Sequence, residues 1–333
     1  MKARGAMVQG ALAAVGLVAA WTTWQREPDH APGEAVVLDV THNDLSKVRF
    51  EDEKKWVELE VRKGDGVWLH TSARLDLKLP ERTLRANESA EKLLERFAPL
   101  RANRSLGALG PDKLKEFGLE APKKKLRITA RGEESTFLVG SSPFGVSDPY
   151  VKDEHDGKVY LLGGSILSDL ESATTRLLDR SLHQFLPSEF DGLTVAAAGK
   201  QREFVQTHAE NSSTAKLAAK ATPEKADEMV KNWHDKVWRL VSTDVLGQNE
   251  NPASGAPQIA ARIDYTFRGK ERGFIELARV IPAAPPDGPA GAPKPLTPQS
   301  EIYARTEHTA GWVKVPASND ELLHEAEKIA ASE

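Results

Sequence analysis

The densest group of side chains capable of chemistry in this sequence is a run of four: Asp153, Glu154, His155 and Asp156. Carboxylates beside an imidazole can ligate a metal ion or work as an acid and a base. The next residue is Gly157, however, and Asp-Gly is a preferred hairpin turn. Successive side chains of a strand point to opposite faces, so these four cannot converge on one ion. The pattern favours a polar hairpin tip.

Motifs with a known chemical mechanism are missing from the rest of the sequence. It has no phosphate-binding loop, no glycine-rich dinucleotide fingerprint, no G-x-S-x-G nucleophile elbow and no paired-histidine zinc helix. It has no cysteine, which removes disulfides, thiolate nucleophiles, cysteine zinc sites and a cysteine-linked lipid anchor. We therefore expect a protein that is not an enzyme, with no catalytic residue, metal site or cofactor.

Tryptophan side chains are a second candidate, because their faces stack on sugar rings and on partner proteins. The relevant ones are Trp56, Trp68, Trp233, Trp238 and Trp312. In an internal repeat of the sequence, Trp233 stands where the first copy has Phe97 on the apolar face of a predicted helix. We expect Trp233 in the core, and we favour packed tryptophans over an exposed binding platform.

Two further segments are basic or rich in proline. Lys123, Lys124 and Lys125 could contact anionic lipid or an acidic partner, but lysines ahead of a strand are typical of a solvated sheet edge. Residues 281–299 could form a polyproline ligand, although their composition is also typical of a solvated loop. We favour the edge and the loop.

Composition limits the class of protein. The chain has 333 residues, enough for two domains, and 40% hydrophobic with 28% charged residues is typical of a globular protein. Its 45 basic and 49 acidic residues give a formal net charge of −4. Because phosphate binding needs a basic surface, we do not expect nucleic acid as a partner.

The N-terminal segment is apolar enough to cross a membrane. Residues 6–24 contain no ionised side chain, and as a helix they would span about 28 Å, close to the thickness of a bilayer's hydrocarbon core. Lys2 and Arg4 precede the segment, which predicts a cytoplasmic N-terminus. The remainder of the chain is then expected on the other side of the membrane.

Residues 1–24 are predicted to be a membrane anchor or a signal segment. The small residues at positions 18–20 follow an apolar core and suit cleavage by a signal peptidase. We favour the retained anchor and keep the cleaved segment as an alternative. Residues 25–35 are polar and contain two prolines and a glycine, which predicts a linker.

The folded body has the pattern of an α+β protein with a mainly antiparallel sheet. Predicted strands in its first half lie at residues 47–50, 56–61, 67–70, 126–129, 135–139, 150–152 and 159–162. Apolar residues at helical spacing predict a helix over residues 88–101, which Asn87 is placed to cap. A shorter helix is predicted at residues 165–171.

The second half of the sequence repeats this order. The matched pairs are Glu88/Glu224, Ala90/Ala226, Leu93/Met229, Leu94/Val230, Phe97/Trp233, Gly132/Gly269, Phe137/Phe274, Tyr150/Tyr303, Glu154/Glu307 and His155/His308. The offset rises from 136 (88 to 224) to 153 (155 to 308), and the rise falls at the proline-rich residues 281–299. We therefore predict two tandem copies of one sheet-plus-helix unit, residues 36–182 and 183–333, with 281–299 as an insertion in the second.

Capping signals place two helices in the second copy. Thr222, Pro223 and Glu224 give a capping threonine followed by proline at the first helical position. Ser318 stands three residues before Glu321, which is the spacing of a capping box. These signals predict helix starts at about residues 223 and 319.

Four stretches resemble a known bacterial family. They are FGLEAPKKKLRITARG (117–132), FLVG (137–140), PYVKDEHDGKVYLL (149–162) and LLDRSL (177–182). In their order and spacing they resemble the family called domain of unknown function 4340, over roughly residues 56–195. The resemblance implies a membrane anchor, a repeated α+β extracytoplasmic region and genes often beside gliding-motility-type ABC transporter components. No catalytic residue carries over, and the second half lacks the FGLEAP stretch.

These expectations combine into one functional hypothesis. The chain is expected to be a non-catalytic extracytoplasmic accessory or scaffold protein of a membrane complex, associated with an ABC transporter. It is expected to pass once through the bacterial inner membrane, to hold its C-terminal region in the periplasm, and to bind protein partners. The alternatives are a periplasmic binding module for envelope polysaccharide or peptidoglycan, and an envelope hydrolase whose site the sequence does not reveal.

Overall fold

The computed structural model describes residues 34–74, 78–208, 214–282 and 300–332, which form an α+β fold with mainly antiparallel sheets. The predicted fold class is thus confirmed. The expected membrane segment, residues 1–24, lies outside the described residues, as does most of the proline-rich insertion. Among the described residues, no helix is both long enough and apolar enough to span a membrane.

The first unit, residues 35–176, is built on a nine-stranded sheet. Its strands are β2 (Leu45–Glu51), β3 (Trp56–Arg62), β4 (Gly66–Thr71), β5 (Arg82–Arg85), β7 (Arg104–Ala108), β8 (Lys124–Ala130), β9 (Glu133–Val139), β10 (Tyr150–Asp153) and β11 (Lys158–Leu161). They lie in the order β5-β4-β3-β2-β8-β9-β10-β11-β7, and all neighbours are antiparallel. A separate pair joins β1 (Ala35–Leu38) to β6 (Leu100–Ala102).

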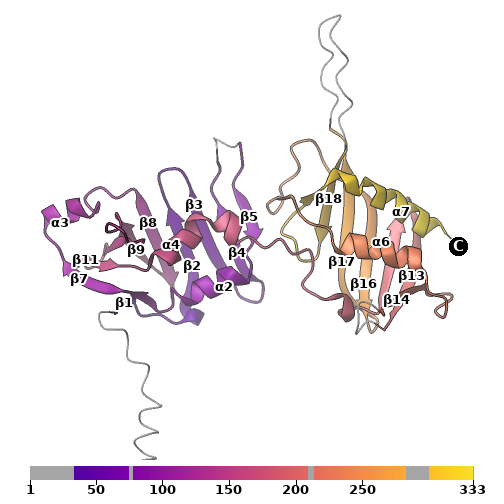
Figure 1. Ribbon diagram of the computed structural model, residues 1–333, viewed down its shortest axis with the longest axis horizontal. Coiled ribbons are helices and arrows are strands. Elements are labelled where there is room, and N and C mark those ends of the chain that lie inside the picture. The colour runs from indigo at the N-terminus through magenta and orange to yellow at the C-terminus, as the bar shows by residue number, and fades with distance from the viewer. Residues whose placement is uncertain (1–33, 75–77, 209–213, 283–299, 333) are drawn as a thin grey trace, which may run out of the picture.

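Helices cover one face of this sheet, as Figure 1 shows for α2 and α4. The helices are η1 (His42–Asp44), α2 (Glu88–Glu95), α3 (Pro111–Glu116), α4 (Gly164–Glu171) and α5 (Ala173–Arg176). The side chain of Asn87 caps α2 by accepting from the backbone nitrogens of Ser89 and Ala90, which confirms the predicted cap. The helix ends before the predicted residue 101, because residues 100–102 pair with β1 as a strand.

The second unit, residues 187–331, is built on an eight-stranded antiparallel sheet. Its elements are η3 (Pro187–Glu189), β12 (Gly192–Ala197), β13 (Lys200–Thr207), β14 (Lys216–Ala219), α6 (Glu228–Trp238), β15 (Asp244–Val245), β16 (Gln258–Phe267), β17 (Lys270–Val280), β18 (Glu301–Thr306), β19 (Val313–Val315), η4 (Ala317–Asn319) and α7 (Asp320–Ala331). In Figure 1, α6 and α7 cross in front of this sheet.

The two sheets follow one strand order. The order β4-β3-β2-β8-β9-β10-β11-β7 in the first sheet matches β14-β13-β12-β16-β17-β18-β19-β15 in the second, and α2 and α6 occupy equivalent places along the chain. Equivalent hairpins also share a turn. Arg131 and Gly132 link β8 to β9, Arg268 and Gly269 link β16 to β17, and all four residues have positive φ, as a type I′ turn requires.

The predicted start of the first helix in the second unit is wrong, whereas that of the second helix is correct to within one residue. Helix α6 begins at Glu228, and the carboxylate of Asp227 caps it by accepting from the nitrogen of Val230 at 3.1 Å. The predicted first turn is not helical, because the nitrogen of Lys225 donates to the carbonyl of Thr222 in a turn and Ala226 bridges to Ala218. Helix α7 begins at Asp320 without a side-chain cap, because the residues around Ser318 form the 3₁₀ helix η4.

Two matched residue pairs and one strand assignment also need correction. Leu93 is buried in the core, whereas its match Met229 is 56% exposed. Phe137 packs in the core, whereas Phe274 lies on the opposite face beneath the guanidinium of Arg262. An irregularity between Tyr265 and Thr266 shifts the register of β16 and β17, so that Ile275 faces the core instead.

The lysine run, residues 123–125, does not mark a sheet edge, because β8 lies between β2 and β9.

Candidate binding site at the junction of the two units

The Asp153–Asp156 run forms the tip of the hairpin between β10 and β11, as predicted. The backbone nitrogen of Gly157 donates to the carbonyl of Asp153 at 3.0 Å. The carboxylates of Asp153 and Asp156 accept from the backbone nitrogens of His155 and Lys158, so both stabilise the turn. Within the residues that the structure describes, no group of three or more His, Cys, Asp or Glu side chains is placed to hold a metal ion.

The tryptophans of the described chain are buried or covered by other side chains. Trp233 is buried, which confirms the prediction for it. The other four carry a cation or a ring against the indole: Arg49 lies over Trp56, Arg62 and Arg85 over Trp68, Arg305 over Trp312, and His183 stacks on Trp238. Other side chains of the protein therefore cover part of each of these indole faces.

The edge strand of the first sheet meets the second unit directly. The carbonyl of Thr83 in β5 accepts from the nitrogen of Gln248 at 2.9 Å, and the carbonyl of Arg85 accepts from the nitrogen of Asp179 at 3.0 Å. Residues 177–186, which link the two units and are called the linker from here on, and the second unit thus pair with backbone carbonyls on the outer edge of β5. Without these contacts the edge strand would be exposed. Buried apolar side chains form one continuous cluster that extends through both units, with Leu178 and Val245 among its members.

Arg82 is the main polar link between the units. Its Nη1 lies 3.1 Å from Asp244 Oδ1, its Nη2 donates to Glu250 Oε1 at 3.0 Å, and its Nε lies 2.9 Å from Glu250 Oε2. Burial would lower the pKa of Arg82, but the hydrogen bonds and charges of Glu250 and Asp244 raise it overall. The guanidinium therefore stays charged and joins β5 to two acidic residues of the second unit.

A second set of contacts fixes the linker to the hairpin that follows β18. Asp179 Oδ2 lies 2.7 Å from His308 Nε2, and Asp179 Oδ1 accepts from the nitrogen of Ser181 at 2.8 Å. The hydroxyl of Thr306 donates to the carbonyl of Leu182. The sequence gives little sign of these contacts, because Asp179 and His308 are 129 positions apart.

Acid should weaken this contact. Burial alone would raise the pKa of Asp179, but hydrogen bonds from His308 and Ser181 lower it overall. The carboxylate therefore stabilises the fold above about pH 4, the usual aspartate value, and this contribution is lost as pH falls through the lowered pKa. We expect the urea midpoint of the native chain to fall more steeply between about pH 5 and pH 2 than that of Asp179→Asn.

The exposed Asp112→Asn in α3 is the control for this prediction. It should follow the native chain over the same pH range, because Asp112 lies on the surface of the first unit. If Asp179→Asn and the native chain lose stability in parallel, the contact of Asp179 with His308 does not contribute as inferred.

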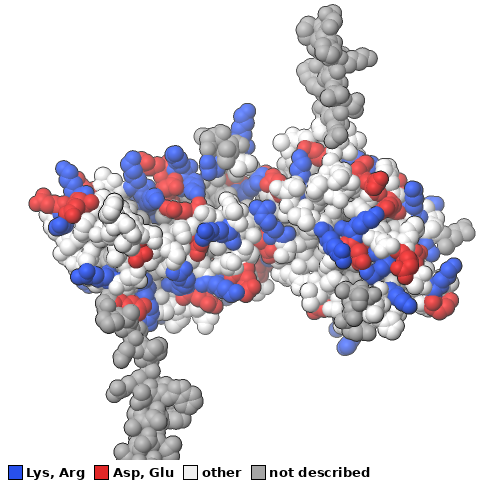
Figure 2. Space-filling model, viewed as in Figure 1, with Lys and Arg blue, Asp and Glu red and all other residues white. Residues whose placement is uncertain are grey.

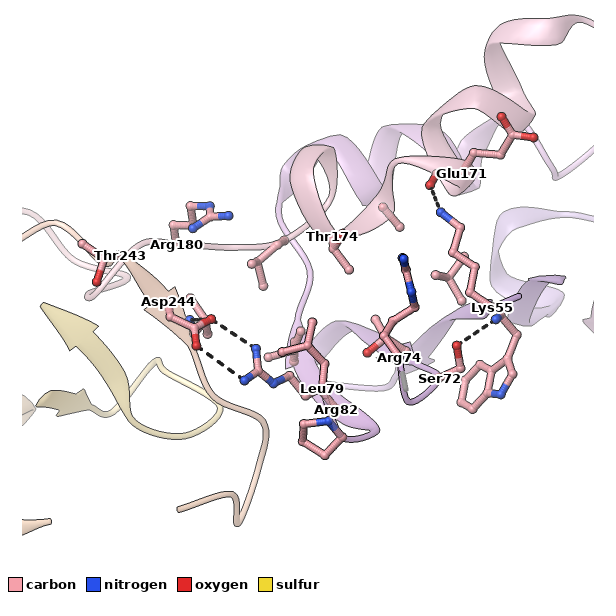
Figure 3. Close-up of a pocket in the computed structure, with 18 residues that line it drawn as sticks. Lys55, Ser72, Arg74, Leu79, Arg82, Glu171, Thr174, Arg180, Thr243 and Asp244 are labelled. Carbon is pink, nitrogen blue, oxygen red and sulfur yellow. Dashed lines mark hydrogen bonds and ion pairs between the residues drawn. The ribbon is translucent and has the colours of Figure 1, made fainter. Parts of the chain in front are cut away.

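A cleft of about 250 Å³ opens beside the junction (Figure 3). Both units and the linker contribute to its walls. Apolar side chains are Trp56, Val57, Leu79, Pro80, Leu84, Ala173, Leu178 and Val245; hydroxyl side chains are Thr71, Ser72, Thr174 and Thr243; charged side chains are Lys55, Arg74, Arg82, Glu171, Arg180 and Asp244. Such an apolar lining with a few placed polar groups is typical of a binding site.

Sequence reasoning did not find this cleft. Its residues come from β3, β5, the end of α4, the linker and β15, and Arg82 is separated from Asp244 by 162 positions. No local motif marks them. The tandem repeat was the one feature of the sequence that could indicate a cleft, because clefts commonly form at the junction of two units in one chain.

Comparison with known proteins gives one family. A model of the family described as "Domain of unknown function (DUF4340)" matches residues 78–258, more than half of the chain. The matched region begins before β5 and ends in β16, so it includes both sides of the junction. No curated protein and no solved structure matches the chain.

Proposed function

We propose that this chain, which belongs to the family called domain of unknown function 4340, is a non-catalytic scaffold or accessory protein of a membrane complex. The observation that carries the proposal is the junction. Arg82, Asp179 and Gln248 hold the two units in one arrangement, and the cleft beside them takes residues from both. A fixed two-unit body with a composite cleft suits the binding of a protein partner.

We place the body outside the cytoplasm, anchored in the bacterial inner membrane by residues 1–24 and projecting into the periplasm. The sequence supports this by its uncharged residues 6–24 and the cations before them. We further propose that the units are copies of one ancestral unit, which their shared strand order supports. The partner would belong to an ABC transporter, as the family resemblance implies.

The charged groups of the cleft support binding over catalysis. They are mostly guanidinium and ammonium groups, and the two carboxylates are already engaged. Asp244 pairs with Arg82, and the carboxylate of Glu171 pairs with Lys124 at 2.6 Å. A general base needs a carboxylate or imidazole that reaches substrate, whereas permanently charged groups hold and orient a ligand.

The tryptophans favour a protein partner over a polysaccharide. Sugar sites use open aromatic faces, and Trp56, which lines the cleft, already carries the guanidinium of Arg49 at 4.0 Å from its ring. Figure 2 shows acidic and basic side chains interspersed on the face in view, without one dominant sign. Such a mixed surface also gives no footprint for nucleic acid.

Purification from native membranes tests the proposal. We expect the full chain, extracted in mild detergent, to bring down the same membrane-protein subunits in repeated preparations, with residues 1–24 still attached. The matched control replaces residues 1–24 with a cleavable secretory signal, which should release the chain and lower the recovery of those subunits at least about tenfold. A chain that always purifies alone, or with glycan only, would contradict the scaffold function.

A further inference from the structure

We propose that the junction cleft binds an extended acidic segment of a partner protein, with the partner's carboxylates against the basic side chains of the cleft. This inference rests on the proposed scaffold function and specifies the chemistry of the partner.

The cleft has an excess of positive charge. Four cationic side chains line it, Lys55, Arg74, Arg82 and Arg180, against two carboxylates. Both carboxylates are neutralised by cations of the protein itself, as described above. Because charge complementarity steers association and selects partners, the charges of Lys55 and Arg180 favour an anionic occupant.

Two cations of the cleft keep charge available for a ligand. Arg180 is exposed, and no hydrogen bond or ion pair joins it to another residue in the described part of the chain. Lys55 contacts the backbone carbonyl of Glu171, which is a neutral acceptor and leaves the ammonium charge uncompensated. Figure 3 shows the two side chains toward opposite ends of the cleft, with Arg74 and Arg82 between them.

The lining of the cleft also includes apolar side chains. Val57, Leu84, Leu178 and Val245 are buried and contribute to the lining. A free phosphate ion would leave this surface in water, whereas a peptide can place apolar side chains on it and carboxylates on the cations. The spread of the cations along the cleft therefore favours an extended segment with acidic and apolar residues in alternation.

The test uses two labelled peptides and the full chain in detergent. The acidic probe is (Glu-Leu-Glu-Ser)₃ and the matched neutral probe is (Gln-Leu-Gln-Ser)₃, compared by fluorescence anisotropy at low salt. We expect the acidic probe to bind at least about tenfold more tightly, and Arg180→Glu to weaken its binding about tenfold, the equivalent of about 1.4 kcal/mol. Both effects should shrink as salt is raised.

Arg239→Glu is the matched control, because Arg239 is also exposed and lies outside the cleft. It should leave binding within about twofold. Equal binding of the two probes, or equal effects of the two substitutions, would overturn the inference. So would binding of inorganic phosphate or of an oligogalacturonate by a chain that fails to bind the acidic peptide.

This test and the membrane purification fail independently. Recovery of membrane subunits without peptide binding would overturn the acidic-segment inference and leave the scaffold function. Peptide binding by a chain that always purifies alone from membranes would overturn the scaffold function, and with it the identity of the partner as part of a membrane complex.

Discussion

Replacing Arg82 with alanine is expected to lower the free energy of unfolding by about 3 kcal/mol. The side chain of Arg82 is 13% exposed and pairs with Asp244 and Glu250, which it would leave without their cation. Removing one partner of a buried ion pair costs about 3–5 kcal/mol. The lower end applies because the side chain of Asp244 is 49% exposed and can regain water. Urea unfolding of the full chain, followed by circular dichroism, measures the change.

Lys123→Ala is the control for this prediction. Lys123 also pairs with a carboxylate, that of Glu53, but both side chains are mostly exposed. Such a surface pair contributes at most about 1 kcal/mol. An effect of Arg82→Ala no larger than that of Lys123→Ala would show that the charged contact does not hold the units together. Arg82→Lys should recover only part of the loss, because an ammonium cannot bridge both acids as the guanidinium does.

Trp233→Ala is expected to cost about 3–5 kcal/mol, the usual range for deleting a buried aromatic side chain. The indole is 1% exposed, and its Nε1 donates to the carbonyl of Leu322 at 3.0 Å. It therefore fills space between α6 and the second sheet and also ties α6 to α7. The substitution leaves a cavity and removes the hydrogen bond between α6 and α7, each of which destabilises the fold.

Met229→Ala on the same helix separates burial from helix propensity. The side chain of Met229 is 56% exposed, so its truncation should change stability by less than about 0.5 kcal/mol. Trp233→Phe should fall between the two, because it keeps most of the apolar volume and loses the hydrogen bond. A Trp233→Ala chain as stable as Met229→Ala would contradict the described packing of α6.

The local features of this fold could be predicted from the sequence, because they depend on neighbouring residues. The Asp156-Gly157 turn, the cap at Asn87 and the buried position of Trp233 all follow from turn chemistry, capping and helical periodicity. The α+β class follows from the same patterns. The turn and the cap depend on contacts within a few positions of the chain, and the burial of Trp233 also follows from its match to Phe97 in the internal repeat.

Features that depend on distant contacts were missed. Helix α6 begins later than predicted because residues 221–225 form turns and Ala226 bridges to Ala218. Local composition favours a sheet edge for the lysine run because it carries no information on strand order, whereas β8 pairs on both sides. The cleft was missed for the same reason. Its central ion pair joins Arg82 to Asp244, which periodicity and motif spacing do not connect.

Site-specific photo-crosslinking in native membranes tests the central claim, that the junction cleft binds a protein of a membrane complex. A photoreactive amino acid at Thr174, which lines the cleft, should capture one membrane-protein subunit. The same group at Asp112 in α3, which Figure 1 places at the end of the first unit away from the second, should capture that subunit at least about tenfold less. Equal capture at the two positions, or capture of glycan alone from Thr174, would contradict the account.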